Sequence, residues 1–318
     1  MLVLNAEQVS TLLDMDALIG ALGPAMLELS AGRVSMPPRT VALAEGKGLL
    51  GTMPAYLPAS RTLCCKLVTV FPGNAQRELH THQAAVMLFD ADTGTPKAML
   101  DGASITALRT AAGSALATRL LAREDAATLL IVGTGVQALS HARAVARVRR
   151  LREVRIAGRD ARKAQQLARS LGQELAIGAR GHAIGVEAFQ GADIVCATTH
   201  AEQPVVKGDW LSPGMHINSV GLNPKGRELD VEAVQKARVF VESRAAALAP
   251  PPSGAGDLVG AQVHAEIGEV LAGSQPGRES AQQITLYKSV GVAAQDAVAA
   301  QLVYDAAVHR RVGTEIDF

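Results

Sequence analysis

The stretch LLIVGTGVQA, residues Leu129–Ala138, decides the fold of this chain. Its apolar start predicts a buried strand, and the segment SHARAVARV at 140–148 predicts a helix directly after it. Between them Gly133, Gly135 and Ala138 spell G-x-G-x-x-A. The first glycine permits a tight turn, the second lets the backbone approach a pyrophosphate, and the third position needs only a small residue. A helix N-terminus then offers N–H groups to phosphate, so the stretch predicts a dinucleotide site.

The chain beyond this stretch alternates between two patterns. Short apolar runs typical of strands are separated by segments with helical periodicity. This alternation predicts a Rossmann-type, doubly wound parallel sheet over residues 121–294. The expected strands are TLLIV at 128–132, EVRIA at 153–157, ADIVCAT at 192–198, MHINSV at 215–220 and ARVFV at 237–241.

The first third of the chain has a different pattern. A helix capped by Asp16 is expected first, followed by five short strand-like runs between residues 39 and 101. No helix long enough for a crossover separates these runs, so a mainly antiparallel sheet is expected. The long apolar helix predicted at 289–311 is expected to pack back on this part. The predicted domains are therefore 1–120 with 295–318, of α+β type, and 121–294 for the nucleotide.

Composition excludes several classes of protein. The 318 residues carry a formal net charge of +1 and only 3% aromatic residues, which gives no basis for nucleic-acid binding. No apolar run reaches the roughly 20 residues of a membrane span, and the N-terminus has no basic leader pattern. The sparse cysteines Cys64, Cys65 and Cys196 favour reduced thiols and show no metal-site spacing. We therefore expect a cytoplasmic protein without a bound metal.

Four cationic or titratable side chains lie in apolar surroundings ahead of the glycine turn. Arg39 follows two prolines, Lys66 lies within LCCKLVTVF, His82 begins HQAAVMLF, and Arg109 lies in a long apolar helix. Taken singly, each is more typical of a surface charge or a structural histidine. Charged groups are seldom buried without a partner, and guanidinium and ammonium groups together suit a carboxylate. The group therefore predicts a pocket for a substrate carboxylate.

The end of the second strand of the nucleotide domain bears on cofactor choice. An acid there would bind the ribose 2′-hydroxyl of NAD, but Glu153 begins this strand and so points away from the ribose. Arg159 stands where a 2′-phosphate would lie, and Arg162 or Lys163 could add to it. NADP(H) is therefore the preferred cofactor, and NAD(H) stays possible because Arg159 can also be a solvated charge beside Asp160.

With these motifs in place, the chain resembles the ornithine cyclodeaminase/mu-crystallin family. The resemblance implies a homodimer of two-domain subunits, in which the first domain serves substrate binding and dimerisation and Arg39, Lys66 and Arg109 hold the substrate carboxylate. It also implies a catalytic role for Lys66, assigned to the matching lysine in the alanine dehydrogenase branch. The cofactor residues it implies are Gly133, Gly135, Val136, Gln137 and Ala138 at the turn, with Thr198, Ser219, Val220, Gly221, Lys288, Ser289 and Gly291 near the nicotinamide. The matching stretches include MPPRT, KLVTVFPGN, HQAAVMLFDADTG, IVGTGVQA, GMHINSVG and YKSVGVAAQDAVAA.

The family divides by reaction, and one position separates the branches. The cyclodeaminase pattern has an aspartate after the segment that matches SVG, whereas this chain has Asn223 nearest to that place. An amide does not titrate near neutral pH, so Asn223 can orient groups but cannot carry a proton. The resemblance thus favours NAD(P)H-dependent reduction of a cyclic ketimine carboxylate, Δ1-pyrroline-2-carboxylate or Δ1-piperideine-2-carboxylate, to L-proline or L-pipecolate.

Other functions stay open from the sequence. Ornithine cyclodeamination and the alanine- or opine-type dehydrogenases are the alternative reactions, and a binding protein without turnover is a further one, because a fold does not guarantee an activity. Within the preferred reaction, Lys66 or His82 could set the protonation state of the imine. Ring size and the proton donor are not decided by these residues.

Overall fold

The computed structural model describes residues 1–223 and 226–317. The chain divides into two compact units. Unit 1 comprises Met1–Arg109 with Val292–Phe318, and unit 2 comprises Thr110–Gly291. The chain first passes between them inside helix α3 (Gly102–Leu121). The predicted fold class, a parallel nucleotide-binding sheet beside a mainly antiparallel one, is confirmed.

Unit 1 is built on one mixed sheet. In the described residues it has seven strands in the order β15-β1-β6-β5-β4-β3-β2. The pairs from β6 to β2 are antiparallel, as expected, and β1 runs parallel to β6. The strands are β1 (Leu2–Leu4), β2 (Thr40–Ala44), β3 (Gly48–Leu57), β4 (Thr62–Val70), β5 (His82–Phe89), β6 (Pro96–Asp101) and β15 (Thr314–Glu315), with a short 3-10 helix at Pro72–Arg77.

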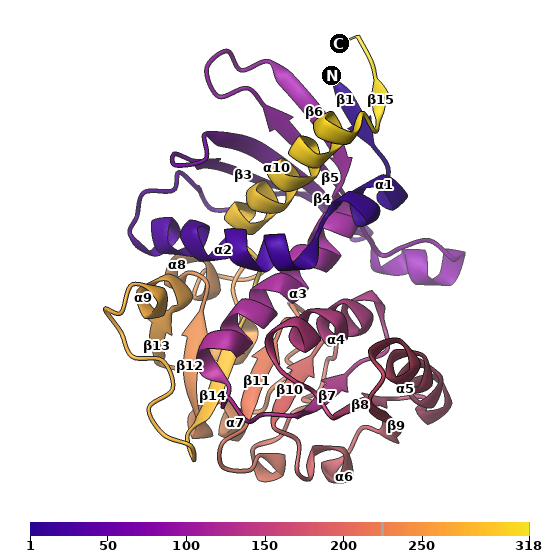
Figure 1. Ribbon diagram of the computed structural model, residues 1–318, viewed down its shortest axis with the longest axis vertical. Coiled ribbons are helices and arrows are strands. Elements are labelled where there is room, and N and C mark those ends of the chain that lie inside the picture. Colours follow the sequence, from indigo (N-terminus) through magenta and orange to yellow (C-terminus); the bar gives the residue numbers. More distant parts are fainter. Residues whose placement is uncertain (224–225, 318) are drawn as a thin grey trace. The chain divides into compact units, whose positions relative to one another are not determined.

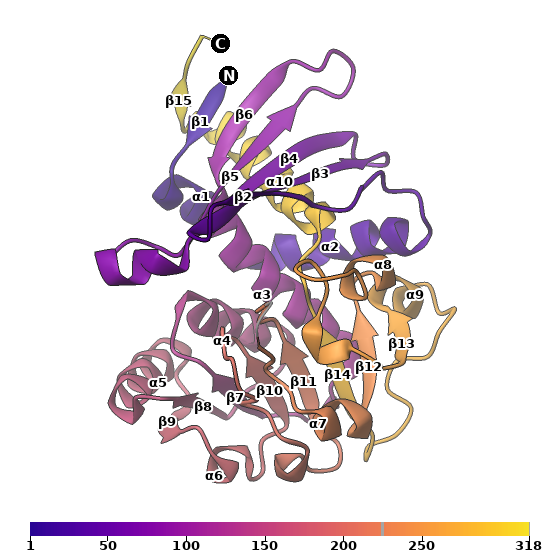
Figure 2. The same cartoon turned by 180° about the vertical axis from the view of Figure 1, so that it is seen from behind.

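Helices cover one face of this sheet. Helix α10 (Ala293–Arg310) packs against β3, β4 and β5 and against α2 (Met15–Ser30), while α1 (Ala6–Leu12) packs against β6. Figure 1 shows α10 in front of the sheet, and Figure 2, from behind, shows the sheet in front of α10. The predicted cap of α2 was wrong by two residues: Asp14, not Asp16, accepts the hydrogen bond from Ala17 N. The helix simply begins one half-turn earlier than its apolar stripe suggests.

Unit 2 is built on a wholly parallel sheet. Its eight strands in the described residues have the order β13-β12-β14-β11-β10-β7-β8-β9. The strands are β7 (Thr128–Val132), β8 (Glu153–Gly158), β9 (Gly178–Ala183), β10 (Ile194–Ala197), β11 (His216–Ser219), β12 (Ala237–Val241), β13 (Val263–Glu266) and β14 (Ile284–Lys288). The helices are α4 (Val136–Val148), α5 (Ala161–Leu175), α6 (Val186–Phe189), α7 (Val231–Lys236), α8 (Arg244–Ala247) and α9 (Ile267–Leu271), with 3-10 turns at Gly208–Trp210 and Gly256–Leu258.

Side chains alternate between two cores on the faces of this sheet. Leu129 and Ile131 of β7 pack with α4 and α5, whereas Leu130 and Val132 pack with the segments around α6, α7 and α8. Strand β7 pairs with β8 on one side and with β10 on the other. The chain order therefore reverses between β7 and β10, and open α/β sheets bind ligands beyond the carboxyl ends of strands at such a point. No helix in the described part of the chain has the length and apolar character of a membrane span.

Candidate functional site

The glycine turn after β7 is locked to the end of β10. Gly133 has a φ of +128°, and a Cβ there would lie 2.6 Å from the Oγ1 of Thr198. Both the N–H and the hydroxyl of Thr198 donate to the carbonyl of Val132. Only glycine fits this close approach. The turn and Thr198 therefore lie together at the reversal point, as the cofactor prediction requires.

The start of helix α4 is open to an anion. Gly135 is its N-cap and supplies no side-chain acceptor, and the first turn has no acid. Nothing in the described residues lies within 4 Å of a Cβ built on Gly135, and Val136 is 65% exposed. The first N–H groups of a helix need partners from outside it. The turn thus fits the pyrophosphate of a dinucleotide, while Ala138, fully buried, packs the helix on the sheet.

Helix α5 begins differently, beside Arg159. Asp160 caps it, and its carboxylate accepts from the N–H groups of Arg162 and Lys163. These N–H groups are therefore already hydrogen-bonded within the protein and do not serve a ligand. The side chains of Arg159, Arg162 and Lys163 are exposed. Recognition of a 2′-phosphate here would therefore rely on these side chains and not on the helix N-terminus.

A buried glutamate joins the loops that follow β10 and β11. The carboxylate of Glu228, 2% exposed, accepts from the N–H and hydroxyl of Thr199 through Oε1. Its Oε2 accepts from the hydroxyl of Ser219 and the N–H of Gly221. Four donors on two loops thus converge on one carboxylate. Glu228 fixes the backbone of the segment that contains the predicted residues Ser219, Val220 and Gly221.

Lys288, at the end of β14, completes this network. Its buried ammonium donates to the hydroxyl of Ser219 at 3.0 Å and to the carbonyl of Gly221 at 2.7 Å. It also pairs with Oδ2 of Asp257 at 2.8 Å. An ammonium has three hydrogens, and these three oxygens match them. Lys288 therefore lies beside Ser219 and Gly221, and its donors are directed at protein atoms.

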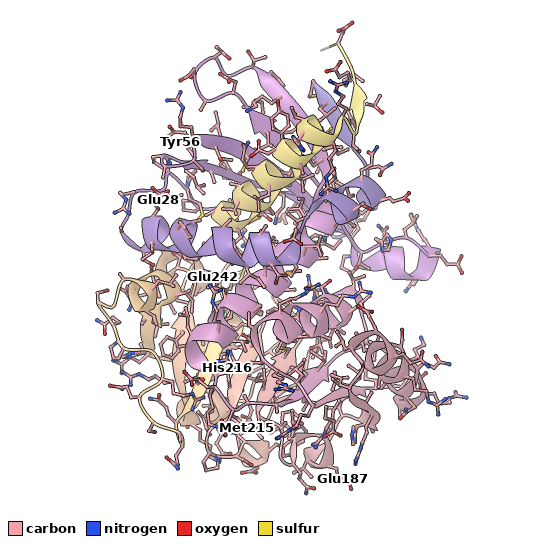
Figure 3. All side chains as sticks on the ribbon, in the orientation of Figure 1. Glu28, Tyr56, Glu187, Met215, His216 and Glu242 are labelled. Carbon is pink, nitrogen blue, oxygen red and sulfur yellow. The ribbon has the colours of Figure 1, made fainter. Side chains whose placement is uncertain are left out.

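A second buried glutamate holds the segment after β14. Glu242, which follows β12 and is labelled in Figure 3, accepts from the hydroxyl of Ser289 and from the N–H groups of Val290 and Gly291. His216, also labelled, begins β11 at the other end of the sheet and bonds Thr285 and Asn218. The predicted residues Ser289 and Gly291 are thus fixed by a carboxylate at the same sheet edge as the glycine turn.

Asn223 lies in the loop after β11. Its side-chain nitrogen lies 3.2 Å from the carbonyl oxygens of both His200 and Ala201 and donates to them. These bonds tie the loop after β11 to the loop after β10. The amide thus orients backbone at the carboxyl end of the sheet, in keeping with a group that cannot carry a proton.

The cations predicted in unit 1 converge on a carboxylate that the sequence reasoning missed. Asp296, in the first turn of α10, is fully buried. Its Oδ2 lies 2.8 Å from Nζ of Lys66, and its Oδ1 accepts from Nε of Arg109 at 2.9 Å. Gln295 Oε1 accepts from Nη1 of Arg109 at 3.1 Å. We call Lys66, Arg109, Gln295 and Asp296 the unit 1 charge cluster.

Burial and charge set the protonation of this cluster. Burial lowers the pKa of Lys66 from 10.5 to about 8, although Asp296 raises it and Arg109 and Arg39 lower it. Burial alone would raise the pKa of the Asp296 carboxyl, but Arg109 and Lys66 outweigh it and hold the pKa below its ordinary range. Lys66 can therefore exchange a proton near neutral pH while Asp296 stays ionised.

The remaining predicted residues of unit 1 lie at different distances from the cluster. Arg39, which directly precedes β2, is partly exposed and acts on the charge of Lys66. His82 begins β5 opposite Val70, whereas Lys66 lies opposite Val86 on the same strand. Four residues of strand correspond to about 13 Å. The structure therefore brings Lys66 and Arg109 together and places His82 well along the strand from them.

Sequence reasoning missed every acid of these clusters. The acids are Glu228, Glu242, Asp257 and Asp296. A usable signal was present for two of them, because Asp296 lies within VAAQDAVAA and Glu242 follows the apolar run VFV, contexts like those that drew attention to the cations. Glu228 and Asp257 lie in polar or turn-rich segments and carried no such signal. In the described residues no group of three or more His, Cys, Asp or Glu side chains is arranged to hold a metal ion.

Comparison with known proteins shows the family to which this chain belongs. The profile of the ornithine cyclodeaminase/mu-crystallin family matches residues 1–311. The chain belongs to this family, which confirms the resemblance seen in the sequence. It is 41% identical to the ketimine reductase mu-crystallin of Mus musculus over 308 residues, covering 95% of this chain and 96% of that protein.

Two solved structures are similar over the whole chain. One is Thermococcus litoralis Δ1-pyrroline-2-carboxylate reductase in complex with NADH and L-proline, with a TM-score of 0.94 and 36% identity, covering 99% of this chain and 100% of that one. The other is an archaeal alanine dehydrogenase dimer with bound NAD, with a TM-score of 0.89 and 34% identity, covering 100% and 99%. The predicted reaction class agrees with the first protein. The second is an alanine dehydrogenase, which is one of the alternative reactions expected from the sequence.

Proposed function

We propose that this protein is an NAD(P)H-dependent reductase of cyclic ketimine carboxylates, acting on Δ1-pyrroline-2-carboxylate or Δ1-piperideine-2-carboxylate. The observation that carries the proposal is the full-length similarity to two imine reductases. The charge cluster of unit 1 and the glycine turn of unit 2 support it, because they supply the two kinds of binding that this reaction needs.

The substrate carboxylate is bound by the cations of unit 1. Asp296 and Gln295 use the Nε and one Nη1 hydrogen of Arg109, which are two of the five N–H donors of a guanidinium. The other N–H groups can donate to a substrate carboxylate, and Arg39 and Lys66 act on the charge of the same site. Lys66 and Arg109 together carry one positive charge more than Asp296 neutralises, and this excess favours an anionic ligand.

The cofactor is bound by unit 2. The turn at Gly133 and Gly135 and the uncapped start of α4 receive the pyrophosphate, and the loops held by Glu228 and Glu242 receive the nicotinamide end. When bound, the reduced nicotinamide supplies a hydride to C2 of the substrate. The carboxylates that fix these loops limit their movement, so that the binding surface is formed in advance.

Lys66 serves as the proton donor. The C=N bond gains hydride at carbon and one proton at nitrogen, and the nitrogen must be protonated to accept hydride readily. Lys66 has a pKa of about 8 and so keeps its proton at neutral pH, yet releases it far more easily than an ordinary lysine. His82 lies about 13 Å along the sheet, which favours Lys66 as the donor.

NADPH is the preferred cofactor in this proposal. Arg159 is an exposed cation directly after β8, and the carboxylate of Asp160 is engaged by the start of α5. We expect Arg159→Ala to weaken NADPH at least tenfold and NADH little, since a phosphate contact of about 1.4 kcal/mol or more is lost. Fluorescence titration of both cofactors measures this, with Arg169→Ala, exposed on the same helix, as control. Equal weakening of both cofactors contradicts the assignment.

A homodimer through unit 1 is also proposed. The sheet face turned away from α10 carries one apolar row across four strands, Pro54, Cys65, Met87 and Met99. On the same side, Leu67 is 39% exposed. Apolar surface of this kind is typical of subunit interfaces. We expect Met87→Glu to convert a dimer to a monomer in light scattering, whereas Arg310→Glu, exposed on α10, has no effect; a wild-type monomer contradicts the proposal.

The reaction itself is tested by NADPH oxidation. We expect turnover with the two cyclic ketimines, and little with pyruvate plus ammonia or with ornithine. Release of ammonia from ornithine with catalytic NAD+ would instead support a cyclodeaminase, and NADH oxidation with pyruvate plus ammonia an alanine dehydrogenase. Cofactor binding with no turnover of any of these would support a binding protein.

A further inference from the structure

The carboxylate of Asp296 occupies a place where the proposed reaction requires no acid. It projects from α10 into the interior of unit 1, between Lys66 of β4 and Arg109 of α3. All three side chains are at least 94% buried. Removal of a carboxylate from water is costly unless its partners are close and well aligned. The α10 N-terminus adds favourable partial charge, because Asp296 lies in its first turn.

Each charged or titratable group that faces this carboxylate can be named. Lys66 and Cys64 come from β4, Arg109 from α3, and Arg39, before β2, acts on Lys66. Burial, followed by the charge of Asp296, raises the pKa of the Cys64 thiol, so Cys64 stays neutral. The two cations that pair directly with Asp296 are Lys66 and Arg109.

We propose that Asp296 is the positioning residue of this site, which holds Lys66 and Arg109 in a fixed relation and retains the proton on Lys66 until a substrate nitrogen takes it. The role in proton delivery rests on the proposed function; the effect on Lys66 does not. In that step the N–H bond of Lys66 breaks, an N–H bond forms on the imine, and hydride from the reduced nicotinamide completes the amine. Neutral Lys66 then recovers a proton from solvent.

The physical reason is that two opposing effects set the pKa of Lys66: burial lowers it and the attraction of Asp296 raises it. Burial favours the neutral amine, and the nearby guanidinium groups of Arg109 and Arg39 act in the same direction. The ion pair with Asp296 opposes all three. Without this pair, Lys66 would be largely neutral at neutral pH, because a lysine buried beside cations loses its proton readily. Arg109 would also lose the acceptor that fixes its Nε edge.

The first test compares pH profiles of wild type and Asp296→Asn, which keeps the shape and removes the charge. For wild type, kcat should fall as the pH rises through about 8, where Lys66 loses its proton. For Asp296→Asn this fall should begin about one pH unit lower or more, with a kcat at least about fivefold smaller at pH 8. Asp305→Asn, exposed on the same helix, should match wild type. An unmoved profile in Asp296→Asn overturns the proposal.

The second test needs no turnover and so separates this inference from the proposed function. Lysine labelled with 13C at Cε is observed by NMR in the intact protein, and the Lys66 signal is identified by its loss in Lys66→Met. We expect its titration midpoint near 8 in wild type and at least about one unit lower in Asp296→Asn. Equal midpoints overturn the proposal even if the enzyme reduces ketimines. If the midpoints differ but no ketimine is reduced, the proposed function fails and the pairing stands.

A third variant covers the case in which Asp296→Asn folds but is too unstable for kinetics or NMR. Lys66→Met with Asp296→Asn removes both groups, so the double variant should melt at a higher temperature than Asp296→Asn alone, because it no longer buries an amine without its partner. Equal or lower melting of the double variant contradicts a pairing of these two groups. An Asp296→Asn protein that folds as stably as wild type contradicts it as well.

Discussion

Two buried lysines, one in each unit, carry the same charge and have different surroundings. The ammonium of Lys288 in unit 2 contacts three oxygens, from Ser219, Gly221 and Asp257. Among the described residues, the ammonium of Lys66 in unit 1 pairs with one carboxylate, that of Asp296. An ammonium carries three hydrogens. Lys288 therefore has a protein acceptor for each hydrogen, whereas Lys66 keeps N–H donors for a ligand.

This difference teaches how burial alone can mislead. Both lysines are almost fully buried, and both pair with an aspartate. A saturated ammonium stabilises loops and has nothing left for chemistry, whereas an unsaturated one can bind a carboxylate or give up a proton. This difference is the reason to propose a structural role for Lys288, within the segment predicted to line the nicotinamide, and a catalytic role for Lys66.

The largest expected effect is the loss of catalysis in Lys66→Met. Loss of a positioned proton donor should lower kcat by about 100- to 10,000-fold. The fold and NADPH binding should persist, because Asp296 keeps its bond to Arg109. Steady-state kinetics and fluorescence titration measure both quantities. Lys97→Met, which removes a lysine stacked on Tyr304, is the matched control and should keep full activity. A Lys66→Met protein with near-normal kcat would remove Lys66 from the mechanism.

Lys288→Met should act on stability. Removal of one partner of a buried pair leaves the carboxylate of Asp257 without its counter-charge, which costs about 3–5 kcal/mol. Urea unfolding of the variant measures this loss. Lys236→Met removes an exposed pair with Glu232 and should change stability by less than about 1 kcal/mol. If Lys288→Met were as stable as wild type but inactive, the contrast between the two lysines would be wrong.

The smallest expected effect is that of Gln295→Leu. Gln295 accepts one hydrogen bond from Arg109 and so helps to aim the guanidinium. We expect KM for the ketimine to rise about fivefold with little change in kcat, since about 1 kcal/mol of orientation is lost. Gln301→Leu, on the same helix and bonded to Asp305, serves as control. A fall in kcat at constant KM would mean that Gln295 acts on the chemical step.

The sequence predicted the elements that have strong periodicity and missed those that lack it. The strands around Leu129–Ala138 were predicted because buried parallel strands are continuous apolar runs. Strands β9, with the sequence GARGHA, and β13, with VHAE, were missed. Both lie at the edges of the parallel sheet, where few apolar side chains are needed. Their pairing depends on the neighbouring strand and not on their own composition.

The sequence singled out the cations of the candidate site and missed its carboxylate. Arg39, Lys66 and Arg109 stood out as cations in apolar segments, and a substrate carboxylate was inferred as their shared partner. The structure adds Asp296, which is 187 residues from Arg109 along the chain and meets it through the packing of α10. No spacing rule links residues so far apart. Acids in equally apolar segments would have been found by the same reasoning applied to both signs of charge.

The contrast between the two lysines can be tested most directly by ligand response. L-Proline, the product expected from the pyrroline substrate, is added to the protein with its lysines labelled with 13C at Cε. We expect the Lys66 signal to move as L-proline binds and the Lys288 signal, identified by its loss in Lys288→Met, to stay in place. Movement of the Lys288 signal alone, or of neither signal when binding is shown by calorimetry, would contradict this expectation.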